Sequence, residues 1–137
     1  MPRIRLMAAN LTSGSSQTYD PGHGIRIFQG AHPDVAMIQE FNYGTNSAAD
    51  VRAFVDAAFG PGFSYFRESG AQIPNGIVSR WPIVASGEWD DTSVANRDFA
   101  WARIDIPVRA RRRSQLRFEL VVYPPRRDAD TGGRRAG

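Results

Sequence analysis

The chain has 137 residues, which is enough for one domain with a packed core and too few to expect two. It contains no cysteine and only two histidines, so disulfide bonds, thiolate metal sites and a cysteine nucleophile are excluded, and a histidine-rich zinc site is not expected. No apolar run approaches the roughly 18 residues of a membrane span, and the first residues lack the apolar core of a signal peptide. We therefore expect a cytoplasmic protein without a membrane span.

The charge of the chain is unevenly distributed. All 17 basic residues are arginine. Residues 1–107 hold 8 arginines against 11 acids, a net charge of −3, whereas residues 108–137 hold 9 arginines against 3 acids, a net charge of +6. The basic pI of the whole chain therefore comes from its last segment, and it does not indicate that the body of the protein binds nucleic acid.

The first predicted elements are a strand over 4–9, which ends at Asn10, and a short helix over 23–30. We expect Ile27 and Phe28 to form the buried side of this helix, which Gly30 would end.

The apolar run 35–39 predicts a second, buried strand that ends in the carboxylate of Glu40. A carboxylate in this position is costly to bury unless it has a partner, and a metal ion is one common partner. The alternative is a structural carboxylate that pairs with an arginine or caps the turn at 42–44.

A second helix is predicted between a cap at Ser47 and a stop at Gly60, because the hydroxyl is followed three residues later by an acid and then by apolar residues at helical spacing. Further short strands are predicted over 63–67, 75–79, 83–86 and 99–106. This order of elements favours an α/β (α+β) layer architecture.

Polar residues lie at four predicted strand ends: Asn10, Glu40, Asn75 and the pair Arg97 and Asp98. Strand ends on one edge of a sheet converge, so these residues could share one cleft. A carboxylate for Mg²⁺, amides that orient it and an arginine that neutralises charge are the parts of a phosphoryl-transfer site. Taken singly, each residue also fits a structural role, as a turn residue or a surface ion pair. Neither histidine is placed to act as a general base.

Four segments together resemble the endonuclease/exonuclease/phosphatase superfamily, which has the deoxyribonuclease-I-like fold. Segment 5–11 is similar to the first-strand motif that ends in asparagine, and segment 33–40 to the second-strand motif that ends in Gln-Glu. Segment 74–83 is similar to the family's Asn-apolar-Ser-Arg-x-Pro-Ile run, and segment 96–98 to the Arg-acid pair before a core strand. The resemblance covers roughly residues 4–106.

This resemblance implies the N-terminal half of a four-layer α/β sandwich and Mg²⁺-dependent hydrolysis of phosphodiester or phosphomonoester bonds, with Mn²⁺ as a substitute. By position, Glu40 would bind the metal, Asn10 would orient the metal or phosphate, Asn75 would lie near the substrate, and Arg97 would contact a phosphate oxygen. Asp98 has the weakest assignment. The resemblance does not identify the substrate, which could be nucleic acid or another phosphate ester. It also does not indicate an oligomeric state.

Family members are roughly twice as long, and their second half brings a strand-ending histidine, a Gly-Asp-x-Asn segment and a closing Asp-His pair. After Ile106 this chain has no histidine and no Gly-Asp-x-Asn run. We therefore expect residues 1–107 to form a truncated domain with half of an active site, little or no activity, and one apolar face left without a partner sheet.

Residues 108–137 are predicted to be a solvated Arg/Pro/Gly-rich tail, in which only 116–122 could form a strand. One hypothesis is translation out of frame, since reading 123–125 one nucleotide later permits Ile or Thr, then His, then Leu. The alternative function for the chain is a non-catalytic module that binds nucleic acid or another polyanion through this tail.

Overall fold

The computed structural model of the chain describes residues 3–11, 23–92, 98–107 and 115–122. In chain order the elements are β1 (Leu6–Asn10), α1 (His23–Ala31), β2 (Val35–Gln39), α2 (Ala48–Ala58), β3 (Ser64–Arg67), β4 (Gly76–Ser79), β5 (Ile83–Trp89), β6 (Phe99–Pro107) and β7 (Gln115–Val122).

The strands of the described residues form two sheets. The first has the order β1-β2-β4-β3, with β1 parallel to β2 and with β4 antiparallel to both β2 and β3. The second is the antiparallel meander β5-β6-β7. The predicted mixed α/β class is therefore confirmed.

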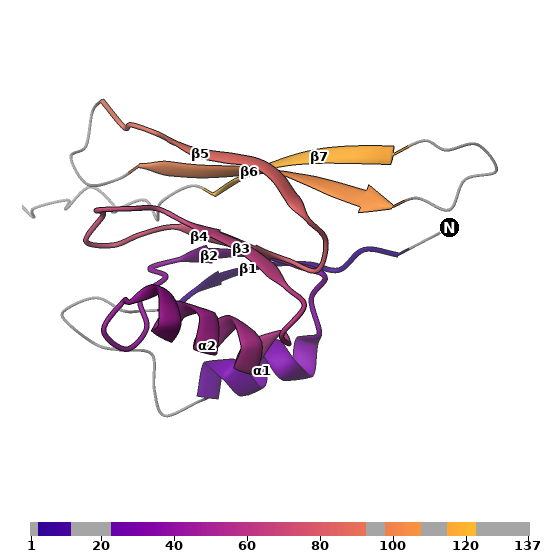
Figure 1. The fold of residues 1–137 in the computed structure, drawn as a ribbon, viewed down its shortest axis with the longest axis horizontal. Coiled ribbons are helices and arrows are strands. Elements are labelled where there is room, and N and C mark those ends of the chain that lie inside the picture. The colour runs from indigo at the N-terminus through magenta and orange to yellow at the C-terminus, as the bar shows by residue number, and fades with distance from the viewer. Residues whose placement is uncertain (1–2, 12–22, 93–97, 108–114, 123–137) are drawn as a thin grey trace, which may run out of the picture.

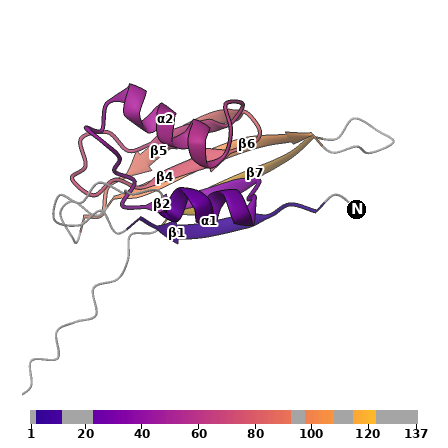
Figure 2. The same cartoon turned by 90° about the horizontal axis from the view of Figure 1, so that it is seen from below.

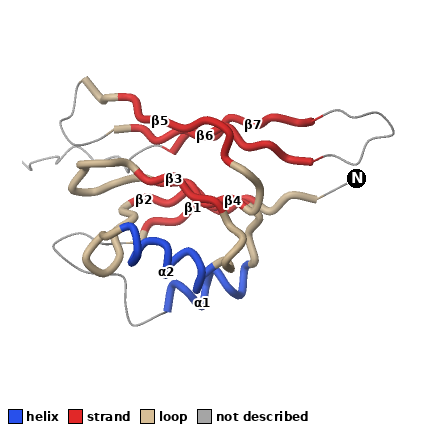
Figure 3. Tube along the Cα trace, in the orientation of Figure 1, coloured by secondary structure: helices blue, strands red, loops and turns tan. Residues whose placement is uncertain are grey.

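These elements stack in three layers (Figure 1). Helices α1 and α2 lie side by side on one face of the first sheet, and the second sheet covers the other face (Figures 2 and 3). The expectation of an apolar face without a partner sheet is wrong, because β5, β6 and β7 supply that sheet.

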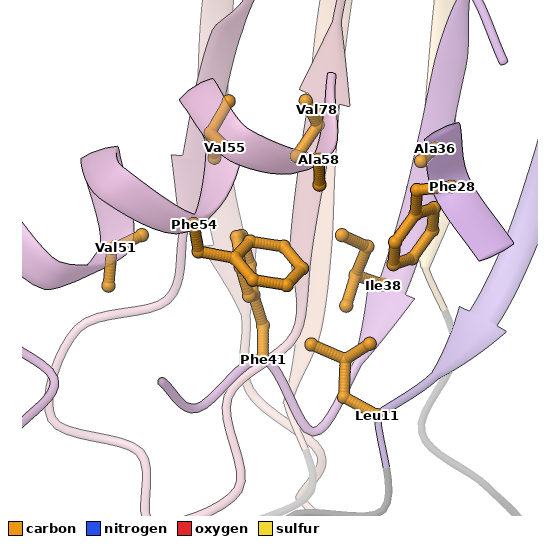
Figure 4. Close-up of a cluster of buried hydrophobic side chains, with 10 residues drawn as sticks. All are labelled: Leu11, Phe28, Ala36, Ile38, Phe41, Val51, Phe54, Val55, Ala58 and Val78. Carbon is orange, nitrogen blue, oxygen red and sulfur yellow. The ribbon is translucent and has the colours of Figure 1, made fainter. Parts of the chain in front are cut away.

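Each face of the first sheet packs into its own hydrophobic core, because successive side chains of a strand point to opposite faces. Ala36 and Ile38 of β2 face the helices, where they meet Phe28 and Phe54 (Figure 4). Val35 of β2 belongs instead to the core between the two sheets. The other buried members of that second core are Ile77, Ala100, Ala102, Ile104, Ile106 and Val122.

Helix α2 forms as its sequence predicts. The Ser47 side chain accepts a hydrogen bond from the Asp50 backbone N–H at 3.1 Å, a cap that contributes about 1 kcal/mol. Its buried residues are Val51, Phe54, Val55 and Ala58, which share one face because they recur at helical spacing.

Helix α1 has the predicted position but a different buried face. Phe28 is buried, as expected, whereas Ile27 is 58% exposed. Ile25 packs against the helix-side core instead. Ile25 and Phe28 are three residues apart and lie on the same face, whereas Ile27 is turned about 100° away from Phe28.

The strand that the sequence allowed over 116–122, within the basic segment, is present as β7. Strand β7 pairs with β6 along its whole length, from Ala100 opposite Val122 to Pro107 opposite Gln115. The change of composition after Pro107 therefore does not mark the end of the folded sheet. Residues 108–114 and 123–137 lie outside the described residues, so a solvated tail remains a prediction there.

We expect Gly76→Ala to destabilise the protein by about 1–3 kcal/mol, as overpacking does. An added Cβ would overlap a ring carbon of Phe41 and lie 2.7 Å from the Phe66 carbonyl oxygen. The measurement is the free energy of unfolding in urea. Gly30→Ala in α1 is the matched control, since nothing lies within 4 Å of its added Cβ and alanine favours helix by about 0.5–1 kcal/mol. Equal urea midpoints for Gly76→Ala and the wild type would contradict this packing.

Candidate functional site

Three strands bring polar residues to one end of the first sheet. Asn10, the last residue of β1, is paired with Gln39, and Glu40 follows directly. Ile38 of β2 is paired with Gly76, the first residue of β4, and Asn75 precedes it. The carboxyl ends of β1 and β2 therefore coincide with the start of β4, so the predicted convergence of Asn10, Glu40 and Asn75 on one sheet end is present.

Asn10 and Glu40 are in direct contact. The Asn10 Nδ2 donates to Glu40 Oε1 at 3.2 Å, and Asn10 is exposed while Glu40 is half-buried. The contact joins residues 30 apart in the chain through the parallel pairing of their strands. An amide and a carboxylate therefore lie together at the carboxyl ends of adjacent parallel strands, where ligands commonly bind in α/β folds.

The backbone of Glu40 has an unusual conformation. Its φ is +54°, in the left-handed region that a residue with a Cβ adopts at a cost of roughly 1–2 kcal/mol. This turn takes the chain out of β2 and places Phe41 in the core, with the Phe41 N–H donating to the Pro74 carbonyl at 2.7 Å. Strain of this kind is found at functional sites more often than elsewhere.

Asn75 is buried rather than open to a substrate. Its backbone N–H donates to Glu68 Oε2 at 2.6 Å, and its Nδ2 donates to Glu68 Oε1 at 3.2 Å and to the Asp98 carbonyl at 2.8 Å. Both side-chain N–H groups are thus used inside the protein. Since Asp98 directly precedes β6, Asn75 joins the two sheets at this end of the molecule.

Glu68 is a residue of this end that the sequence reasoning missed. It is 1% exposed, and burial raises the pKa of its carboxyl group, with further upward contributions from the nearby carboxylates of Glu88 and Asp98. The hydrogen bonds from Asn75 act in the opposite direction and lower the pKa. Glu68 directly follows a predicted strand, so the strand-end criterion that selected Glu40 could have found it.

Arg67 is a second residue of this end that was not predicted from the sequence. Its Nε donates to the Phe41 carbonyl at 2.6 Å and its Nη2 to Asn42 Oδ1 at 2.9 Å, and burial lowers its pKa. Both partners lie in the segment that follows Glu40. Arg67 therefore fixes that segment and adds a positive charge at this end of the sheet.

The remaining predicted residues are placed only in part. Arg97 lies outside the described residues, as do Arg109, Arg111 and the other arginines of 108–114 and 123–137. Their predicted roles on phosphate or polyanions stay predictions. Asp98 is described: its Oδ1 accepts from the Asp91 N–H at 3.2 Å, so its carboxylate holds the backbone at Asp91.

The described residues contain no group of three or more His, Asp or Glu side chains that could hold a metal ion. Nor does any helix in these ranges have the length and apolarity needed to cross a membrane.

No family model and no curated protein matches the chain.

We expect Glu68→Gln to destabilise the protein by about 1–3 kcal/mol, because the new amide would place an N–H group against the N–H donors of Asn75. The loss should depend on pH. Because the pKa of Glu68 is raised, the folded state binds its proton more tightly than the unfolded state does. This group's contribution to stability therefore falls as pH rises from the ordinary glutamate pKa of about 4.3 through the raised value.

The variant lacks this titration, so the difference in unfolding free energy between wild type and Glu68→Gln should shrink as pH rises through that window. Urea unfolding at a series of pH values measures it. A difference that is constant or grows with pH would show that Glu68 is not a buried carboxyl with a raised pKa.

Proposed function

We propose that this chain carries the metal-binding side of a Mg²⁺-dependent phosphoesterase site, in a domain of the endonuclease/exonuclease/phosphatase type with a deoxyribonuclease-I-like fold. The observation that carries the proposal is the 3.2 Å contact between Asn10 Nδ2 and Glu40 Oε1 at the carboxyl ends of adjacent parallel strands. The layered α/β architecture and the left-handed backbone of Glu40 support it.

The residues present supply the smallest set of protein ligands that commonly holds Mg²⁺. Mg²⁺ takes oxygen ligands and is commonly held by one or two carboxylates, with water and substrate phosphates in its other positions. Glu40 supplies one carboxylate, and Asn10 supplies an amide oxygen on the side chain whose nitrogen contacts that carboxylate. When bound, the ion would polarise a phosphoryl oxygen and offset its negative charge.

The residues around Glu40 and Asn10 have supporting roles. Asn75 and Glu68 hold the start of β4 and tie it to β6, so they keep this end of the two sheets in register. Arg67 adds a half-buried positive charge, which favours an anionic substrate. Contact of Arg97 with a phosphate oxygen remains part of the proposal.

We assign no general base at this end, because the carboxylates of Glu68 and Asp98 accept structural hydrogen bonds from Asn75 and Asp91. His32, whose side chain is exposed, precedes β2 and therefore lies at the opposite end of the sheet. We therefore expect this chain to bind Mg²⁺ and to hydrolyse phosphodiesters weakly or not at all, because proton transfer by a positioned side chain typically contributes 10²–10⁴-fold to a rate, or about 3–5 kcal/mol.

The test is a calorimetric titration of the full chain with Mg²⁺. We expect Glu40→Gln to weaken binding by about tenfold or more, because it removes the only carboxylate assigned to the ion. Asp56→Asn is the matched control: it removes a carboxylate that forms a 2.7 Å ion pair with Arg52 on α2, away from the site, and should leave Mg²⁺ affinity unchanged.

Equal Mg²⁺ affinity in the wild type and Glu40→Gln would contradict the metal assignment. Hydrolysis of bis(p-nitrophenyl) phosphate tests the remaining part. A fast, Mg²⁺-dependent rate that Glu40→Gln abolishes would support the phosphoesterase assignment. It would also overturn the expectation that the chain lacks the half of the site that supplies the general base.

A further inference from the structure

A cavity of about 290 Å³ lies at the other end of the first sheet. Its polar residues are Arg5, which precedes β1, His32 and Asp34, which precede β2, and Arg80, which follows β4. These are the ends of the three strands opposite to the Asn10 and Glu40 contact, since Leu6 pairs with Val35 and Val35 pairs with Ser79. The cavity is therefore separate from the proposed phosphoesterase site and does not depend on it.

One wall of the cavity is charged. Asp34 is 7% exposed, and its two carboxylate oxygens accept from the Arg5 backbone N–H at 2.9 Å and from Arg80 Nη1 at 3.2 Å. This anchors the Arg80 guanidinium, whose side chain is 63% exposed. Each guanidinium carries five N–H donors in a planar fork, so Arg80 keeps donors beyond the one given to Asp34.

The charge of Arg5 is not offset in the same way. Its Nη1 donates to the Ala31 carbonyl at 3.2 Å, and no ion pair links its side chain to a carboxylate of the described residues. With Arg5 and Arg80 against Asp34, the formal charge of this wall is positive. It favours an oxyanion, the group that a guanidinium recognises by paired hydrogen bonds.

Three aromatic residues also line the cavity. Phe28 and Phe59 have ring centroids 4.8 Å apart, and Phe59 and Phe63 have centroids 5.6 Å apart. Phe28 is buried, whereas Phe59 and Phe63 are half-buried, so their rings form the surface available to a ligand. Such rings favour contact with another flat apolar group, in offset or tilted packing.

We propose that this cavity binds a small aromatic oxyanion, with its ring against Phe59 and Phe63 and its negative group between Arg5 and Arg80. The volume suits this ligand: a cavity of about 150 Å³ holds a benzene ring, and small-molecule pockets begin at about 300 Å³. Carboxylate and phosphonate share the chemistry that the arginines recognise, so either group on a single ring qualifies.

The experiment is an NMR titration of the isotope-labelled full chain without divalent cations, using benzoate and phenylphosphonate as probes. We expect each to bind with a dissociation constant of about 1 mM or lower. Phenol, which has the ring without the charge, and inorganic phosphate, which has the charge without the ring, should each bind at least about tenfold more weakly. The shifted backbone amides should be those of the non-proline residues within 31–34 and 58–63.

Arg5→Gln should weaken both probes by about tenfold or more, because it removes the cation that has no carboxylate partner. Arg103→Gln is the matched control, since Arg103 is an exposed arginine on β6 away from the cavity. Binding of phenylphosphonate without binding of benzoate would support the site and restrict its ligands to aromatic phosphonates. Absence of saturable shifts for both probes would overturn the proposal, as would equal binding by wild type and Arg5→Gln.

Discussion

The position of β2 in the centre of the first sheet is the constraint on which the rest of the structure depends. The strand is parallel to β1 on one side and antiparallel to β4 on the other. Ala36 and Ile38 fill the core under the helices, and Val35 fills the core between the sheets. A shift of one residue in this strand would exchange its two faces, and it would also separate Asn10 from Glu40. Packing and site geometry are thus fixed by the same pairing register.

The two ends of this sheet have different chemistry. At one end, the strained backbone of Glu40 and the buried pair of Glu68 and Asn75 are features that cost stability, and they lie together at the place where we propose a cation. At the other end, Asp34 and Arg80 form an ion pair at a cavity that is also lined by aromatic rings. Between them, both faces of the sheet are packed in hydrophobic cores, which provide the fixed support that a binding site requires.

Local patterns in the sequence predicted the elements, and their limits explain what was missed. Helix α2 could be predicted because its cap at Ser47 and its apolar spacing lie within a few residues. The burial of Ile25 rather than Ile27 could not, since it depends on how α1 packs against distant elements. Glu68 acquires its role only when the β3–β4 connection folds back and brings Asn75 to it. Pairing between remote segments likewise decided that β5, β6 and β7 form a second sheet.

The most direct test of the account is to locate Mg²⁺ on the molecule. In an isotope-labelled sample of the full chain, we predict that Mg²⁺ shifts the side-chain amide signal of Asn10 and the backbone amide of Glu40 in a saturable way, while the amides of Asp34 and Arg80 at the opposite end stay unchanged. The Mg²⁺ site proposed at the contact between Asn10 and Glu40 predicts this localised response. Saturable shifts centred elsewhere, or no saturable shift at Asn10, would contradict the central claim.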